Sequence, residues 1–232
     1  MITVAQQEHL HHNLNQIGML QDRLPAAVVL LIGLAAGATA LLPGMWAGSK
    51  YLYTIAHEGG GHAFMAGLVG LPIKSVTMKF NGSGLTLSEG RQGLRVFLFQ
   101  FFGYLGPSAL GVGTAKLIEL HHIVAVLWLL LLGLAIIFVF SRGFAMLCVI
   151  GTGFLLFVVA WYAPLGMQIA VAYGISWFLL VSGAVIAIKH WQAEEGDGKL
   201  LKSWIPLPQI LWSLLWLIGC GAALLFGATL LV

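Results

Sequence analysis

Two histidines and a glutamate form the most chemically suggestive group in this chain. They stand in one short run, His57-Glu58-Gly59-Gly60-Gly61-His62. Imidazole nitrogens are common zinc ligands, and a neighbouring carboxylate can take a proton from a metal-bound water. The run lies inside an apolar stretch from Tyr51 to Gly70, where an unpaired ionisable group is costly. The sequence therefore predicts a buried zinc site with His57 and His62 as ligands and Glu58 as the catalytic base.

The spacing of the two histidines places a demand on the backbone. They are five residues apart, one more than in the common His-Glu-x-x-His arrangement. On a regular α-helix this spacing turns them about 140° apart, so they could not share one ion. A π-type turn brings positions i and i+5 over one another, and three consecutive glycines permit it. We expect such a turn or a kink over residues 56–63. The alternative is a regular helix that pairs Glu58 with His62 and leaves His57 outside the site.

Composition places these residues in an integral membrane protein. Hydrophobic residues make up 59% of the 232 residues and charged residues only 8%. We expect an all-α polytopic fold, with a polar N-terminal arm over residues 1–25 and one transmembrane domain over residues 26–232. Pro164 predicts a tight turn between the fifth and sixth spans, with one kinked helix as the alternative. The seven expected spans cover residues 26–43, 51–70, 94–116, 122–140, 144–163, 166–188 and 208–231.

The connection between the second and third spans has the pattern of a β-hairpin. Residues 73–80 alternate in part, residues 81–84 (Asn-Gly-Ser-Gly) are typical of a turn, and residues 85–87 resume the alternation. Its free strand edge could take an extended peptide, whereas the simpler alternative is a hairpin that only connects two helices. We assign Asn81, Gly84 and Thr86 as candidate substrate-binding residues beside the histidine run.

The basic residues predict an orientation in the membrane. With seven spans, nine lysines and arginines fall on one side, and only Lys50 and Lys116 fall on the other. The positive-inside rule then predicts a cytoplasmic N-terminus and a C-terminus outside. The net charge of +3 follows from this asymmetry. Because no aromatic and basic motif accompanies it, we expect no nucleic-acid partner.

Three segments resemble the small bacterial branch of the site-2 protease family of intramembrane zinc metallopeptidases. They are residues 56–63, the hairpin with residues 82–86, and residues 103–109 (Gly-Tyr-Leu-Gly-Pro-Ser-Ala). The resemblance covers about residues 50–190, with His57, Glu58 and His62 at the positions of the ligands and the base. It implies that the chain hydrolyses membrane-anchored protein substrates within the lipid bilayer of the bacterial inner (plasma) membrane. Residues 103–107 match the helix that borders the site.

The resemblance also implies an aspartate as a third ligand, from a later helix. The two aspartates, Asp22 and Asp197, both lie outside the expected spans, so the third ligand stays open. Glu119, His121 and His122 are substitutes by chemistry, although we expect them on the outer side. Two alternatives to a protease remain: a non-catalytic relative that acts as a membrane binding or regulatory protein, and a transporter of metal ions or protons.

Overall fold

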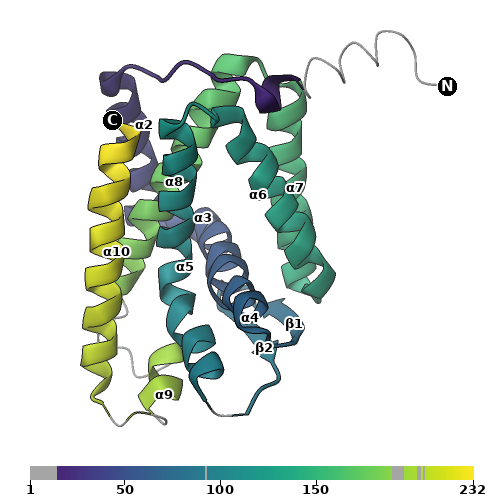
Figure 1. Cartoon of the computed structure of the whole chain (residues 1–232), viewed down its shortest axis with the longest axis vertical. Helices are drawn as coiled ribbons and strands as arrows, with labels where there is room; N and C mark the ends of the chain where they lie inside the picture. Colours follow the sequence, from purple (N-terminus) through teal and green to yellow (C-terminus); the bar gives the residue numbers. More distant parts are fainter. Residues whose placement is uncertain (1–14, 92, 190–195, 203–204, 206) are drawn as a thin grey trace, which may run out of the picture.

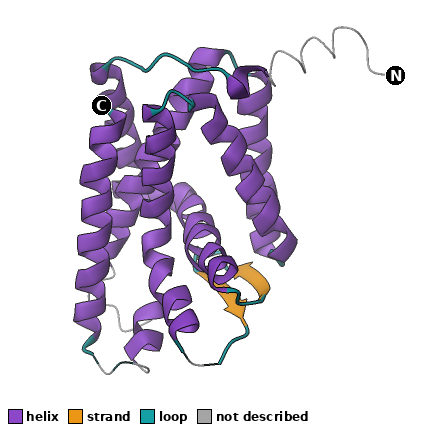
Figure 2. Ribbon diagram, viewed as in Figure 1, coloured by secondary structure: helices purple, strands orange, loops and turns teal. Residues whose placement is uncertain are grey.

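The computed structural model describes residues 15–91, 93–189, 196–202, 205 and 207–232. The first 14 residues of the expected N-terminal arm lie outside this range. Helices dominate the structure (Figure 2). Five of them are long and apolar enough to cross a membrane: α5 (Leu94–Glu119), α6 (Ile123–Phe140), α7 (Phe144–Tyr162), α8 (Leu165–Lys189) and α10 (Gln209–Leu231). The break between α7 and α8 confirms the turn that Pro164 predicts.

The first two expected spans form one bent unit. Helix α2 (Ala26–Leu41) meets α3 (Pro43–Ile55) at Leu42, and α3 continues through η1 (Ala56–Ala63) into α4 (Phe64–Val69). The two arms of this unit meet at 94°. Pro43 begins α3, where its missing N–H and fixed φ suit the start of a new helix. Among the described residues there are thus five candidate spans, or six if the bent pair counts as one, and the expected seven are not confirmed.

The two ends of the membrane region lie at the same end of the bundle (Figure 1). The Arg23 guanidinium, just before α2, donates hydrogen bonds of 2.7 and 2.8 Å to the carbonyls of Leu230 and Leu231. The start of α2 and the end of α10 therefore lie together, whereas seven spans would place the two ends on opposite sides of the membrane. Hydropathy suggested two crossings here, but α2 and the segment from α3 to α4 are bent by 94° at Leu42, as in a broken span or a re-entrant loop.

Helix α8 is the central helix of the bundle. It packs against α2, α5 and α10, and its Tyr173 and Leu180 are completely buried. Small residues let the neighbours approach closely: a Cβ at Gly111 of α5 or at Gly227 of α10 would lie within 2.8 Å of the Leu180 side chain. Close packing of this kind is a main source of helix association in a bilayer.

The hairpin forms as the sequence predicts. Strands β1 (Ile73–Met78) and β2 (Gly84–Ser88) pair antiparallel, with Val76 opposite Thr86. Gly82 has a φ of +93° in the turn, and the Lys79 N–H donates to the Ser83 carbonyl. The other edge of β1 is partly covered, because the Arg142 N–H donates to the Val76 carbonyl. The hairpin therefore lies at the α6–α7 turn, beside η1.

A short helix, α9 (Asp197–Lys202), follows the central helix at the same end of the bundle as the hairpin (Figure 1). It packs against α5 and α10. Its Leu201 is 1% exposed and belongs to a buried cluster with Trp212 and Trp216 of α10. Burial of this one apolar side chain anchors a helix that is too short to be stable alone.

Candidate metal centre

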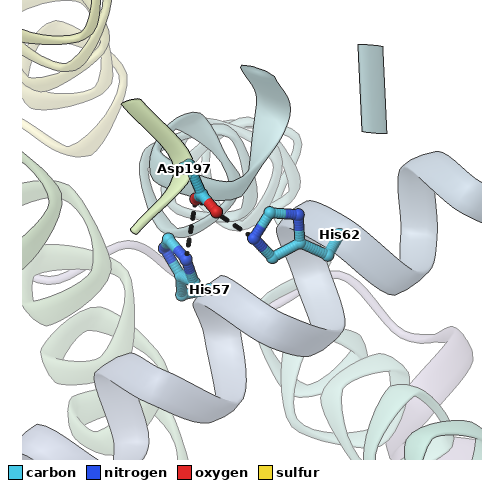
Figure 3. Close-up of side chains that lie close together, drawn as sticks. All are labelled: His57, His62 and Asp197. Atoms are coloured by element: carbon cyan, nitrogen blue, oxygen red, sulfur yellow. Dashed lines mark ion pairs between the residues drawn. The ribbon is translucent and has the colours of Figure 1, made fainter. Parts of the chain in front are cut away.

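The histidine run forms a π-helix, η1 (Ala56–Ala63), inside an otherwise α-helical segment. This confirms the expected π-type turn over the same residues. The wider turn brings the two histidines together, with ring centroids of His57 and His62 4.9 Å apart. A regular helix with opposed histidines is therefore excluded, and both imidazoles point to one side of the segment (Figure 3).

The third side chain at this point is Asp197, at the first position of α9. Its Oδ2 lies 3.4 Å from His57 Nε2 and 3.2 Å from His62 Nε2 (Figure 3). The three donor atoms are all within 4.8 Å of one another. The third ligand stayed open because Asp197 lies outside the expected spans, and that reason was wrong. A signal was available, since the chain has only two aspartates and Asp197 precedes the last span on the expected hairpin side.

The three residues that were considered as alternative third ligands lie away from the two histidines. Glu119 forms an ion pair with Lys116 at the far end of α5. The His121 ring nitrogen Nδ1 lies 2.9 Å from the Gln21 carbonyl, and His122 is its neighbour in the α5–α6 turn. At 1.5 Å per residue, Glu119 is roughly 24 Å along the helix from Gly103, which touches the histidine site. None of the three contributes to the cluster around Asp197.

The protonation pattern of His62 favours a cation at this site. The Phe99 carbonyl can only accept a hydrogen bond, so His62 Nδ1, 2.8 Å away, donates its proton there. In the neutral ring Nε2 then carries a lone pair, and this lone pair faces Asp197 Oδ2. Oδ2 is buried and has no hydrogen-bond partner in the structure. Two facing acceptors are stable only with a proton or a metal ion between them.

The distances also fit a metal ion. Zinc ligands lie about 2.0–2.1 Å from the ion, so neighbouring ligand atoms of a tetrahedral site are about 3.3 Å apart. The separations from Asp197 Oδ2 to His57 and His62 are 3.4 and 3.2 Å. Burial raises the pKa of the Asp197 carboxyl, but when His62 and His57 are protonated their charge and hydrogen bonds outweigh this and hold the pKa well below its ordinary value. The carboxylate is therefore ionised, as metal binding requires.

The predicted base lies beside the ligands and under the hairpin. Glu58 is 4% exposed, and the Thr86 hydroxyl donates a 2.7 Å hydrogen bond to its Oε2. A Cβ at Gly84 would lie 2.5 Å from Glu58 Oε1, so only glycine allows the strand to approach so closely. Two of the three predicted substrate-binding residues, Gly84 and Thr86, thus lie against Glu58. Asn81 instead organises the turn, where its Oδ1 accepts from the Ser83 N–H, and its side chain is exposed.

Helix α5 borders the site with its small residues, as expected for residues 103–107. A Cβ at Gly103 would lie 2.4 Å from His62 Nε2 and 2.7 Å from Asp197 Oδ2. A Cβ at Gly61 would meet the Gly103 carbonyl at 2.6 Å, and backbone cannot yield as a flexible side chain can. Tyr104 closes another side, with its ring edge-on to that of His57 at 4.9 Å. The site is therefore enclosed by η1, α5 and α9.

Comparison with known proteins gives one match. The chain matches a family model described as Peptidase M50B-like over residues 27–227. No curated protein and no solved structure matches it. The matched region contains the histidine run, the hairpin and Asp197.

Proposed function

The chain belongs to the Peptidase M50B-like family, the site-2 protease family, and from this premise we propose that it is an intramembrane zinc metalloprotease. Its substrates would be membrane-anchored proteins, whose peptide bonds it hydrolyses within or near the bilayer. The observation that carries the proposal is the position of Asp197 Oδ2, 3.2–3.4 Å from two histidine Nε2 atoms. This set of one carboxylate and two imidazoles would leave a fourth position open for water, as catalytic zinc sites do.

The roles of the side chains follow from their positions. His57, His62 and Asp197 would hold zinc, which would supply a bound water of lowered pKa and polarise the scissile carbonyl. Glu58 would accept the proton of that water and later deliver it to the leaving nitrogen. The Thr86 hydroxyl holds Glu58 Oε2 in place while the hairpin covers it. Burial keeps bulk water away from the carboxylate and strengthens each of these interactions.

The hairpin offers a place for an extended substrate. Strand β2 carries Gly84 and Thr86 against the base, while its Leu85 and Leu87 are exposed. A substrate segment that unfolds from a helix and pairs with β2 would pass beside Glu58. Backbone hydrogen bonds would hold it in the extended form that hydrolysis needs, with little dependence on sequence.

We infer that the hairpin end of the bundle faces the cytoplasm. Arg23 and Lys116 lie at the other end and Lys50 lies in α3. Nine of the 11 basic residues belong to the hairpin end, because the Lys50 side chain lies against Gly82 of the hairpin turn. The other eight are Lys74, Lys79, Arg91, Arg95, Arg142, Lys189, Lys199 and Lys202. The positive-inside rule then sets the hairpin and α9 in the cytoplasm and the end of α10 outside. This orientation keeps the expected side for the hairpin and reverses the expected side for the start of the chain.

Labelling of single cysteines tests this orientation. In a variant without Cys148 and Cys220, Ser83→Cys marks the hairpin turn and Leu120→Cys marks the α5–α6 turn; both positions are exposed or partly exposed. A membrane-impermeant maleimide should label Leu120→Cys on intact cells and Ser83→Cys only after the membrane is opened. The reverse pattern would contradict the proposed orientation.

Metal analysis is the first test of the function. Protein purified without chelators should contain about one zinc per chain, and His57→Ala should lose it, because a site of three protein ligands does not survive with two. His122→Ala is the matched control, since that histidine lies in the α5–α6 turn. Absence of zinc from the parent protein would refute the protease proposal. Zinc without any cleavage would favour the non-catalytic relative, and zinc movement across vesicles would favour a transporter.

A further inference from the structure

We propose that Gln100 is a positioning residue for the metal centre: its amide holds the Asp197 carboxylate so that one oxygen faces both histidines. The inference rests on the zinc site of the proposed function. Gln100 Nε2 donates a hydrogen bond of 2.5 Å to Asp197 Oδ1, while Oδ2 faces His57 and His62. The two carboxylate oxygens thus have separate partners. Rotation of the carboxylate would break the Gln100 hydrogen bond and the histidine contacts at once.

The need for such a contact follows from the place of Asp197. His57, His62 and Glu58 stand on the continuous helical segment from α3 to α4, whereas Asp197 stands on α9, a helix of six residues. Leu201 anchors this helix by burial, which fixes its position but not the rotation of a carboxylate one turn away. Apolar contact is non-directional, so a directed hydrogen bond is required to set the carboxylate plane.

Helix α5 is well suited to supply that bond. Gln100, Gly103 and Tyr104 are three and four residues apart, so they share the face of α5 that η1 and α9 approach. Gly103 leaves room for His62 and Asp197 on this face, and Tyr104 packs against His57. One helix face therefore shapes the space, orients a histidine and orients the carboxylate.

The surroundings direct the Gln100 amide toward Asp197. A cavity of about 100 Å³ lies between α5 and α9, and among the described residues the side chains that line it with Gln100 are apolar: Val96, Phe97, Leu200 and Leu201. The carboxylate is the polar partner that the structure gives this amide. Glutamine also suits the task chemically, since a lysine or arginine here would neutralise Asp197 and set a second positive charge beside the metal.

Zinc affinity measured on the full chain tests the inference. Gln100→Met keeps the length of the side chain and removes the donor, so we expect zinc binding to weaken about 10- to 100-fold, as when a group behind a metal ligand is lost. Gln100→Asn withdraws the amide by one methylene and should also weaken binding. Gln168→Met is the matched control, because Gln168 is 2% exposed in the first turn of α8 and bonds only to a backbone carbonyl among the contacts of the structure.

Two readouts separate positioning from general damage. Zinc dissociation constants come from competition with a chelator of known affinity, and the absorption spectrum of the Co²⁺-loaded protein reports the ligand geometry. We expect both to change in Gln100→Met and Gln100→Asn and to stay at parental values in Gln168→Met, with similar thermal unfolding in all three. Parental affinity and spectrum in both Gln100 variants would overturn this inference and leave the zinc site standing. A parent chain that binds no zinc would instead refute the proposed function.

Discussion

Replacing Glu58 with glutamine should stop peptide-bond cleavage while zinc stays bound. Glutamine keeps the size of the side chain and can still accept a hydrogen bond from Thr86, which now donates to Glu58 Oε2. It cannot accept the proton of a bound water, and general-base catalysis contributes typically about 10²- to 10⁴-fold to a rate. We therefore expect a loss of turnover of about this size, with the zinc content of the parent protein.

Cleavage can be measured across all membrane proteins of a cell at once. Mass spectrometry of membranes from cells that express the parent chain should reveal new N-termini inside or next to transmembrane segments, and Glu58→Gln cells should lack them. Glu89→Gln is the control, since Glu89 lies just after β2 and pairs at the surface with Lys74. The same new termini in Glu58→Gln cells would remove Glu58 from the mechanism. Loss of zinc in this variant would make Glu58 a ligand instead.

Replacing Asp197 with alanine should remove most of the zinc affinity. Asp197 supplies the one carboxylate oxygen that faces both histidines, and two imidazoles alone make a weak zinc site. The loss should exceed the roughly 10- to 100-fold expected when a group behind a ligand is removed. The loss of zinc affinity should therefore be larger in the Asp197 variant than in the Gln100 variants. The same chelator competition measures both.

Asp22→Ala provides the control for this change. Asp22 is the other aspartate of the chain, and it is exposed at the opposite end of the bundle from the metal centre. We expect parental zinc affinity for Asp22→Ala and also for Glu119→Ala. If Asp197→Ala bound zinc as tightly as the parent, the histidines would have a different third ligand and the fit of the Asp197 distances would be coincidental.

Several features of the site were predictable because they depend on neighbours in the sequence. Five-residue spacing between His57 and His62 allows a shared ion only through a wider helical turn, and the structure has a π-helix over residues 56–63. Turn residues between two alternating segments predicted the hairpin, which forms with Gly82 at positive φ. The proline at position 164 separated α7 from α8. Each of these depends on local geometry, which a few consecutive residues determine.

The number of spans and the relative positions of the two ends of the bundle's chain depended on a bend. Hydropathy does not record such a bend. Hydropathy suggested one crossing over residues 26–43 and another over 51–70, but the chain turns by 94° between the helical segments 26–41 and 43–69. Hydropathy measures how apolar a segment is and carries no information about its direction. The contact of Arg23 with the carbonyls of Leu230 and Leu231 shows the outcome, with both ends together.

By itself, then, the sequence determined the groups that η1 carries: two imidazoles, a carboxylate beside them, and a backbone that must widen to align the imidazoles. Only the tertiary structure decided which residue joins the two histidines in the candidate metal centre. Asp197 is far from the histidines in the chain and outside the apolar segments, so the sequence offers only its rarity as an aspartate and its place on the expected hairpin side. It reaches the site because Leu201 buries α9 against α10 and Gln100 orients the carboxylate, and these contacts exist only once α5, α9 and α10 have packed.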